Sequence, residues 1–286
     1  MSTRDIRSIG VVGAGQMGSG IAQVAAAAGY DVVMSDASKD LAEKGKARID
    51  AVLGKQVEKG KMTAEDRAAL VARIATAGGP EDFGACDLVV EAATENVDLK
   101  LKIFAQLDGL LQPGAIIATN TSSISISRLA AATRRPGKVV GMHFFNPVPV
   151  MALVELIRAL QTSDATFAAA GALVRKIGKT PVKVRNSPGF VVNRLLCPMI
   201  NEAIFALGEG LAGAEQIDQA MKLGANHPIG PLALADLIGL DVELAVMQVL
   251  FEGFKDSKYR PAPLLVEMVE AGRLGRKTKQ GFFRYD

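Results

Sequence analysis

The chain has 286 residues, of which 49% are apolar and 22% are charged, and its net charge is +3. This length is expected for one large domain or two ordinary ones, and the apolar content excludes a disordered chain. The small net charge gives no reason to expect nucleic acid as a partner. The two cysteines match no metal spacing, no apolar run reaches about 18 residues, and no signal peptide is visible. We therefore predict a cytoplasmic protein with no metal and no membrane partner.

Strand-like and helix-like segments alternate along the first two thirds of the chain. The predicted strands cover residues 9–12, 31–34, 73–77, 88–92, 115–119, 139–142 and 181–184. The predicted helices cover residues 17–28, 38–59, 63–71 and 98–110, the third of them with Thr63 as its N-cap. Such alternation predicts an α/β fold of the Rossmann type, with a mostly parallel, doubly wound sheet.

The pattern changes near residue 185. Beyond it, helical periodicity is interrupted by glycine and proline, and the predicted helices cover residues 190–207, 214–223, 231–237, 242–254 and 263–271. We therefore predict a dinucleotide-binding domain at residues 1–185 and an all-helical domain at residues 186–286.

The segment Gly13-Ala14-Gly15-Gln16-Met17-Gly18 matches GxGxxG. It follows a predicted strand, opens a predicted helix and precedes a second strand that ends at Asp36, which is the context that a dinucleotide site needs. Gly13 suits a tight turn, Gly15 a close approach of the backbone to a pyrophosphate, and Gly18 close packing of helix on strand. A carboxylate at Asp36 binds ribose hydroxyls and repels a 2′-phosphate, so NAD is favoured over NADP. The same fingerprint also serves FAD.

Two histidines, His143 and His227, are the candidates for a proton acceptor. Histidine titrates near neutral pH and is the usual general base or acid. His143 follows a predicted strand downstream of the fingerprint, whereas His227 lies beside Pro228 in a predicted turn and is interpreted as structural. From the residues alone, a neutral histidine in the core is the alternative for His143.

Several motifs in the same order resemble the short-chain L-3-hydroxyacyl-CoA dehydrogenases, and among them the bacterial 3-hydroxybutyryl-CoA dehydrogenases. The resemblance covers essentially the whole chain. Besides the fingerprint, it rests on Glu91-Ala92-Ala93-Thr94-Glu95-Asn96, Asn120-Thr121-Ser122-Ser123, Met142-His143-Phe144-Phe145-Asn146-Pro147, Pro188-Gly189-Phe190-Val191-Val192-Asn193-Arg194, and Gly275-Arg276-Lys277-Thr278.

The resemblance implies reversible, NAD-dependent oxidation of a (S)-3-hydroxyacyl-CoA, such as 3-hydroxybutyryl-CoA, to the 3-oxoacyl-CoA, here acetoacetyl-CoA. It implies His143 as the base and acid, with Glu155 as the carboxylate that orients it. Ser122 and Asn193 are implied at the reacting end of the substrate. A helix N-cap is the alternative for Ser122, and a structural hydrogen bond is the alternative for Asn193.

The resemblance further implies cofactor contacts for Glu95, Lys100, Ser122, Asn146 and Lys277. It implies that Lys55 and Lys59 bind the phosphates of CoA. These two lysines lie four residues apart and so share a helix face. Ordinary solvated surface charges are the alternative for the lysines and for Glu95.

Two rival interpretations remain open at this point. One is an oxidoreductase of similar build that acts on a free hydroxy acid or sugar acid, as gulonate-type dehydrogenases do. The other is a non-catalytic NAD-binding protein on the same scaffold, because a fold alone does not prove turnover. The resemblance also implies that the helical domain closes the substrate cleft and forms a homodimer.

Overall fold

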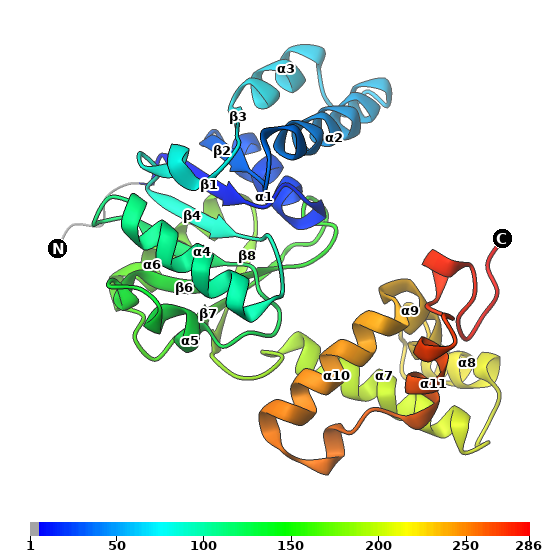
Figure 1. The fold of residues 1–286 in the computed structure, drawn as a ribbon. Coiled ribbons are helices and arrows are strands. Elements are labelled where there is room, and N and C mark those ends of the chain that lie inside the picture. Colours follow the sequence, from blue (N-terminus) through cyan, green and yellow to red (C-terminus); the bar gives the residue numbers. More distant parts are fainter. Residues whose placement is uncertain (1–5) are drawn as a thin grey trace. The chain divides into compact units, whose positions relative to one another are not determined.

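The computed structural model describes residues 6–286, and the chain divides into two compact units at Ser187 and Pro188. The first, here called the α/β unit, contains one eight-stranded sheet among its described residues, in the order β3-β2-β1-β4-β5-β6-β7-β8 (Figure 1). The strands are β1 (Ser8–Val12), β2 (Asp31–Ser35), β3 (Ile74–Ala77), β4 (Leu88–Glu91), β5 (Ile116–Thr119), β6 (Val139–Phe144), β7 (Leu153–Arg158) and β8 (Thr180–Arg185).

The first six strands are parallel, and the remaining two reverse direction. β7 pairs antiparallel with β6, and β8 runs parallel to β7. The predicted mostly parallel, doubly wound sheet is confirmed. β7 was not among the predicted strands, because the run Leu-Val-Glu-Leu-Ile-Arg has no polar alternation, and periodicity does not distinguish a short buried run of this kind from a helical segment.

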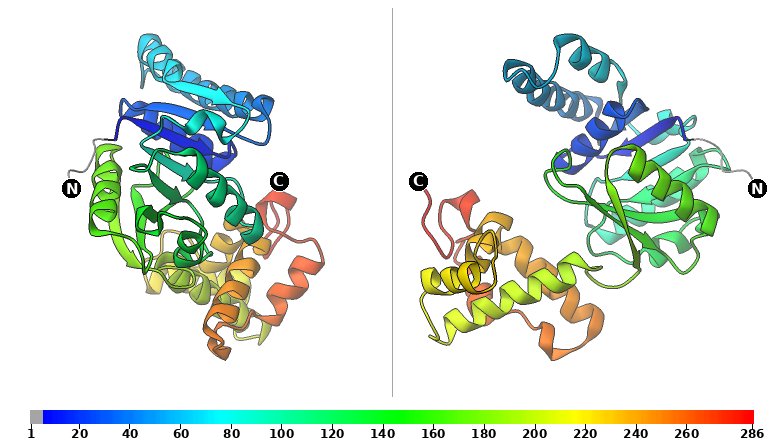
Figure 2. Two further views of the ribbon diagram at one scale, coloured as in Figure 1. Left: turned by 60° about the vertical axis from the view of Figure 1, so that its left-hand side comes forward. Right: turned by 180° about the vertical axis from the view of Figure 1, so that it is seen from behind.

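Helices cover both faces of this sheet. They are α1 (Gln16–Ala27), α2 (Lys39–Glu58), α3 (Ala64–Ala72), α4 (Val97–Leu110), α5 (Ile126–Ala131) and α6 (Asp164–Lys176), with short 3₁₀ turns at Pro80–Phe83 and Pro136–Lys138. The helices α4 and α5 lie on the near side of the sheet in Figure 1, and α6 comes to the front when the molecule is seen from behind in Figure 2. Thr63 is the N-cap of α3, as predicted, and accepts the N–H of Asp66.

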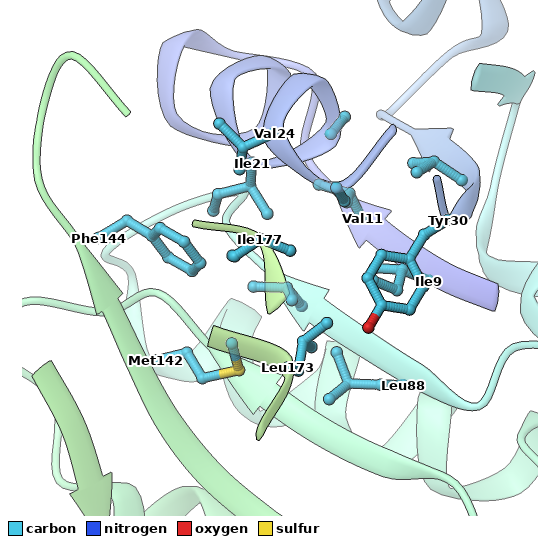
Figure 3. Close-up of a cluster of buried hydrophobic side chains, with 14 of the residues drawn as sticks. Ile9, Val11, Ile21, Val24, Tyr30, Leu88, Met142, Phe144, Leu173 and Ile177 are labelled. Carbon is cyan, nitrogen blue, oxygen red and sulfur yellow. The ribbon is translucent and has the colours of Figure 1, made fainter. Parts of the chain in front are cut away.

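The core on the α1 and α6 face is continuous and apolar. Figure 3 shows Ile21 and Val24 of α1 together with Phe144 of β6, Leu173 of α6 and Ile177, the C-cap of α6. All of these side chains are buried, so α1 is anchored against the strands by its packing. The glycine-rich turn that precedes α1 is thereby fixed over one edge of the sheet.

The second unit, here called the helical unit, consists of helices and short turns. Its α-helices are α7 (Val192–Gly208), α8 (Ala214–Gly224), α9 (Pro231–Ile238), α10 (Leu240–Phe254) and α11 (Pro263–Glu270), with 3₁₀ turns at Ser257–Tyr259 and Arg276–Thr278. Ile200, Ile204, Leu232, Leu240 and Leu265 form the centre of its own core. Across the described residues, no helix is long and apolar enough to cross a membrane.

Candidate active site

The glycine-rich loop lies where the winding of the sheet changes direction. From β1 the chain winds outward to β2 and β3, then returns to β4 on the other side of β1. Gly13 has φ of +96°, and a Cβ there would lie 2.7 Å from the carbonyl oxygen of Ala92, in the loop after β4. The loops after β1 and β4 therefore meet at the carboxyl end of the sheet, where open α/β sheets bind dinucleotides.

The other two glycines of the loop fit the roles predicted for them. A Cβ at Gly18 would lie 1.8 Å from the carbonyl oxygen of Gly13, so no side chain fits between α1 and the loop. Gly15 is the N-cap of α1, and a Cβ there would meet no described heavy atom within 4 Å. The first turn of α1, which contains Gln16 and Met17, has no acidic residue. The positive end of the helix dipole is thus free of acidic side chains, and Gly15 leaves open space beside it.

The peptide groups around Ala14 are held by side chains. The N–H of Ala14 donates to Asp36 Oδ2 at 2.7 Å, and its carbonyl accepts from Ser19 Oγ at 2.8 Å and from the guanidinium of Arg48 on α2. The other oxygen of Asp36 accepts the N–H of Ala37 at 2.7 Å. Asp36 therefore lies beside the loop, as the fingerprint predicts.

Arg48 was not among the predicted site residues. Its contact with the loop spans 34 positions of the chain and depends on how α2 packs. The one signal in the sequence is the spacing of Arg48 and Lys55. They are seven residues, or two helical turns, apart, so the two side chains lie on the same face of the helix.

A buried ion pair lies under the loop after β4. Glu91 and Lys100 are 0% and 1% exposed, and the Lys100 ammonium donates to Glu91 Oε2. The same carboxylate accepts from Thr119 Oγ1 and from the Ala93 N–H, each at 2.9 Å. Burial of this pair is tolerable because both charges are compensated and hydrogen-bonded. Lys100, expected to contact the cofactor, is directed at Glu91 and lies 4.0 Å from Glu95.

Glu95 connects this ion pair to Ser122. Its Oε1 accepts from both the N–H and the hydroxyl of Ser122, at 2.7 and 2.9 Å, and its Oε2 accepts from Thr121 Oγ1 at 2.7 Å. The hydroxyl of Ser122 is thereby oriented at the end of β5. The N-cap alternative for Ser122 is wrong, because Ser125 caps α5.

His143 and Glu155 face each other across neighbouring strands. They are directly paired residues in the antiparallel ladder of β6 and β7, and His143 Nδ1 lies 2.8 Å from Glu155 Oε2. The two residues are 6% and 0% exposed. An ionised carboxylate can only accept, so a Glu155 in that form would place the hydrogen of this bond on Nδ1. The ladder register therefore sets the orientation of the ring.

Other polar groups fix the surroundings of His143. Asn120 Oδ1 accepts the N–H of Phe144 at 2.9 Å, so the end of β5 is tied to the residue after His143. The ring of Phe145 packs against the imidazole, with a centroid distance of 4.5 Å. Asn146 follows in the exposed loop before β7. The sequence motif contained Asn120, but only the pairing of β5 with β6 reveals what it holds.

Lys55 and Lys59 lie at the far end of α2 and are both exposed. Lys55 is in the last turn of the helix, and Lys59 is its C-cap. Their spacing of four residues and their exposure fit the predicted shared face.

The remaining predicted residues belong to the helical unit. Asn193 is the second residue of α7 and is half-buried. Lys277 forms an ion pair with Asp241 at the start of α10. A further acidic side chain of this unit, Asp236, accepts the N–H groups of Phe282 and Phe283 at 3.0 and 2.9 Å and thereby holds the C-terminal segment in place.

The glycine loop, the Asp36 carboxylate and the hydrogen-bonded histidine lie at the carboxyl ends of parallel strands of one sheet. No group of three or more potential metal ligands occurs among the residues that the structure describes. This edge of the sheet has the build of a dinucleotide-binding oxidoreductase.

Comparison with known proteins identifies the family. Residues 8–187 match the model of the NAD-binding domain of 3-hydroxyacyl-CoA dehydrogenase, and residues 189–285 match the model of its C-terminal domain. The chain is 56% identical over 280 residues to the 3-hydroxybutyryl-CoA dehydrogenase of Bradyrhizobium diazoefficiens, covering 98% of this chain and 96% of that protein. It is 50% identical to the enzyme of that name from Clostridioides difficile, covering 97% and 99%.

Among solved structures, the (S)-3-hydroxybutyryl-CoA dehydrogenase of Ralstonia eutropha is 60% identical, with a TM-score of 0.96, and the match covers 99% of this chain and 100% of that chain. The protein belongs to the 3-hydroxyacyl-CoA dehydrogenase family, and the predicted family and enzyme class are confirmed.

Proposed function

We propose that this protein catalyses the reversible, NAD-dependent oxidation of (S)-3-hydroxybutyryl-CoA to acetoacetyl-CoA. The observation that carries the proposal is the buried His143–Glu155 pair, whose geometry suits a general base. The full-length similarity to enzymes named 3-hydroxybutyryl-CoA dehydrogenase supports the short-chain thioester as substrate.

The proposed chemistry assigns the proton to His143. In the oxidative direction, Nε2 takes the proton of the 3-hydroxyl while the hydride on C3 leaves, and in the reductive direction the imidazolium returns that proton to the alkoxide oxygen. When bound, a nicotinamide would supply the acceptor or donor of the hydride. Glu155 stabilises the imidazolium through the 2.8 Å bond to Nδ1. The Ser122 hydroxyl donates to Glu95 in this structure, so it is proposed to accept from the 3-hydroxyl of the substrate, and to donate to the 3-oxygen only after turning away from Glu95.

The preference for NAD over NADP is assigned to Asp36. Each of its carboxylate oxygens accepts one backbone N–H and keeps lone pairs for ribose hydroxyls. A 2′-phosphate would bring a second negative charge against this carboxylate, which supports NAD as the cofactor. Cofactor contacts are also proposed for Glu95, Asn146 and Lys277, with Lys100 acting through Glu95.

The thioester substrate is assigned to the basic face of α2 and to the helical unit. Lys55 and Lys59 are proposed to bind phosphates of CoA as point charges, and Asn193 to bind the reacting end of the acyl chain.

We further propose that the protein forms a homodimer through the helical unit. Three leucines of that unit, Leu195, Leu211 and Leu223, are 69–79% exposed. A mass measured by light scattering at working concentration tests this, and the mass of a single chain would refute it.

The function is tested by NADH consumption with acetoacetyl-CoA, beside parallel assays with free acetoacetate and with NADPH. We expect turnover only when acetoacetyl-CoA and NADH are supplied together. Turnover with free acetoacetate at the same rate would favour a free-acid dehydrogenase, and NADH binding without turnover would favour a non-catalytic protein.

A further inference from the structure

A buried lysine holds the loop that joins His143 to Glu155. Lys179 lies between α6 and β8 and is 8% exposed. Its ammonium donates to three main-chain carbonyls of one loop, those of Val148 at 2.6 Å, Met151 at 2.7 Å and Pro149 at 3.3 Å. The three N–H groups of the ammonium are thus matched by three acceptors.

The loop at residues 145–152 has both members of the proposed catalytic pair near its ends. It begins two residues after His143, contains Asn146, and ends three residues before Glu155. Within the loop, the N–H groups of Val150 and Met151 donate to the Pro147 carbonyl at 2.9 and 3.0 Å. These local bonds form a turn, but they do not attach it to the rest of the sheet.

Long-range contacts make that attachment. The Thr180 N–H donates to the Ala152 carbonyl at 2.8 Å, and Lys179 holds the middle of the loop. On another side, α1 packs so closely that a Cβ at Gly20 would lie 2.7 Å from Cβ of Val148, which is itself 2% exposed. The loop is therefore fixed to the helix that follows the glycine-rich turn and, through Lys179, to the start of β8.

The electrostatics of Lys179 are unusual for a buried cation. Among residues 6–286, no carboxylate lies within ion-pair distance of its ammonium, so loop carbonyls are its partners. Burial without a counter-charge lowers the pKa of Lys179 from its ordinary value. A methionine at this position would fill the same space without that desolvation cost, so the contribution specific to lysine is its three directed hydrogen bonds.

We propose that Lys179 is a positioning residue, whose ammonium fixes the loop at residues 147–151 and thereby holds Asn146 and the ends of β6 and β7 in the reactive arrangement. This inference rests on the proposed function, in which His143 and Glu155 act as a pair. Lys179 is not a catalytic residue, because it reaches the proposed site through the backbone of the loop.

The test compares Lys179→Met with Lys183→Met in the full-length protein. Lys183 lies on β8 and is exposed, so its variant controls for loss of a positive charge on that strand. Hydrogen exchange of the peptide covering residues 144–153 reports on the loop without any need for activity. In Lys179→Met we expect exchange of the Val148, Val150 and Met151 amides to quicken by about tenfold or more, with the strands unchanged. Lys183→Met should match the wild type.

Kinetics test whether the loop matters for the reaction. In Lys179→Met, kcat should fall by about tenfold to 100-fold with little change in the KM for acetoacetyl-CoA, since small misplacements near reacting groups slow the chemical step. The primary isotope effect with deuterated NADH should rise, because hydride transfer becomes the slower step. A merely destabilised fold would lower the active fraction and leave the isotope effect unchanged.

Chemical rescue separates the hydrogen bonds from packing and covers the case in which Lys179→Met does not fold. Methylammonium should restore part of the kcat of Lys179→Ala, whereas tetramethylammonium, which has no N–H donor, should not. Unchanged loop exchange in Lys179→Met, or equal rescue by both cations, would overturn the proposal. Inactive wild-type protein whose loop still loosens in Lys179→Met would instead refute the proposed function and leave the anchoring of the loop supported.

Discussion

Replacing Glu243 with glutamine should stabilise the helical unit, and the gain should grow with pH. Glu243 lies in the first turn of α10 and is 0% exposed. Neither carboxyl oxygen has a hydrogen-bond partner among the described residues, and the neighbouring polar group is the thiol of Cys197, a weak donor. Burial raises the pKa of Glu243 from 4.5 to about 8.

The pH dependence follows from this shift. In the unfolded chain Glu243 ionises near its ordinary pKa, whereas the folded protein keeps it protonated up to about pH 8. The folded state therefore binds the extra proton, so the contribution of Glu243 to stability is most favourable below pH 4.5 and is lost as pH rises to about 8. Over about 3.5 pKa units, at about 1.4 kcal/mol each, the loss approaches about 5 kcal/mol, and at pH 7 it is about 3 kcal/mol.

Glu243→Gln keeps the shape of the neutral side chain and has no proton to bind. The free energy of unfolding is measured by urea unfolding followed by far-UV circular dichroism, at fixed protein concentration. Between pH 5 and 8, the difference between the variant and the wild type should grow in favour of the variant by about 1.4 kcal/mol per pH unit. Glu202→Gln, an exposed position on α7, is the control and should show no such slope. A stability difference that stays constant across this pH range would refute the reasoning.

The remaining predictions concern the α/β unit. His143→Gln should keep the fold and NADH binding but lower turnover by roughly 10²–10⁴-fold, and near-normal turnover would remove this residue from the mechanism. The double variant Lys55→Ala, Lys59→Ala should mainly raise the KM for acetoacetyl-CoA, and an unchanged KM would show that CoA is bound elsewhere. Lys100→Met should reduce the free energy of unfolding by about 3–5 kcal/mol, because it leaves a buried carboxylate without its cation. Lys102→Met, an exposed position on the same helix, should change it little, and equal losses in urea unfolding would contradict the assignment.

Local patterns predicted most of the fold. The bounds of α2, α8 and α11 agree with the prediction within one residue at each end. These helices have caps, glycines or prolines at their ends, so the signals lie within a few residues of the element. Pro147 and Pro149 indicate a turn after β6, but the antiparallel direction of β7 has no local signal, because it depends on which strand the segment reaches in the folded sheet.

The same distinction between local and long-range signals applies to the residues of the site. Residues whose role depends on a short motif, such as Gly13, Gly18 and Asp36, lie where the sequence predicted them. Arg48 and Lys179 were missed, because a lysine or arginine in a helix or before a strand normally indicates a solvated charge. Only packing shows that each donates to a carbonyl distant in the sequence.

Buried charged groups in both units have hydrogen-bond partners, as Asp218 and Asp236 do in the helical unit. In the α/β unit, Glu91, Lys100, Glu155 and Lys179 are buried, and each has a hydrogen-bond partner directed at it. Such groups are costly to desolvate, and networks of this kind favour one arrangement over its alternatives. Glu243, in the helical unit, has no such partner among residues 6–286 and is expected to reduce stability. We therefore infer that Glu91, Lys100, Glu155 and Lys179 help to fix the strand ends of the α/β unit, where the proposed chemistry takes place.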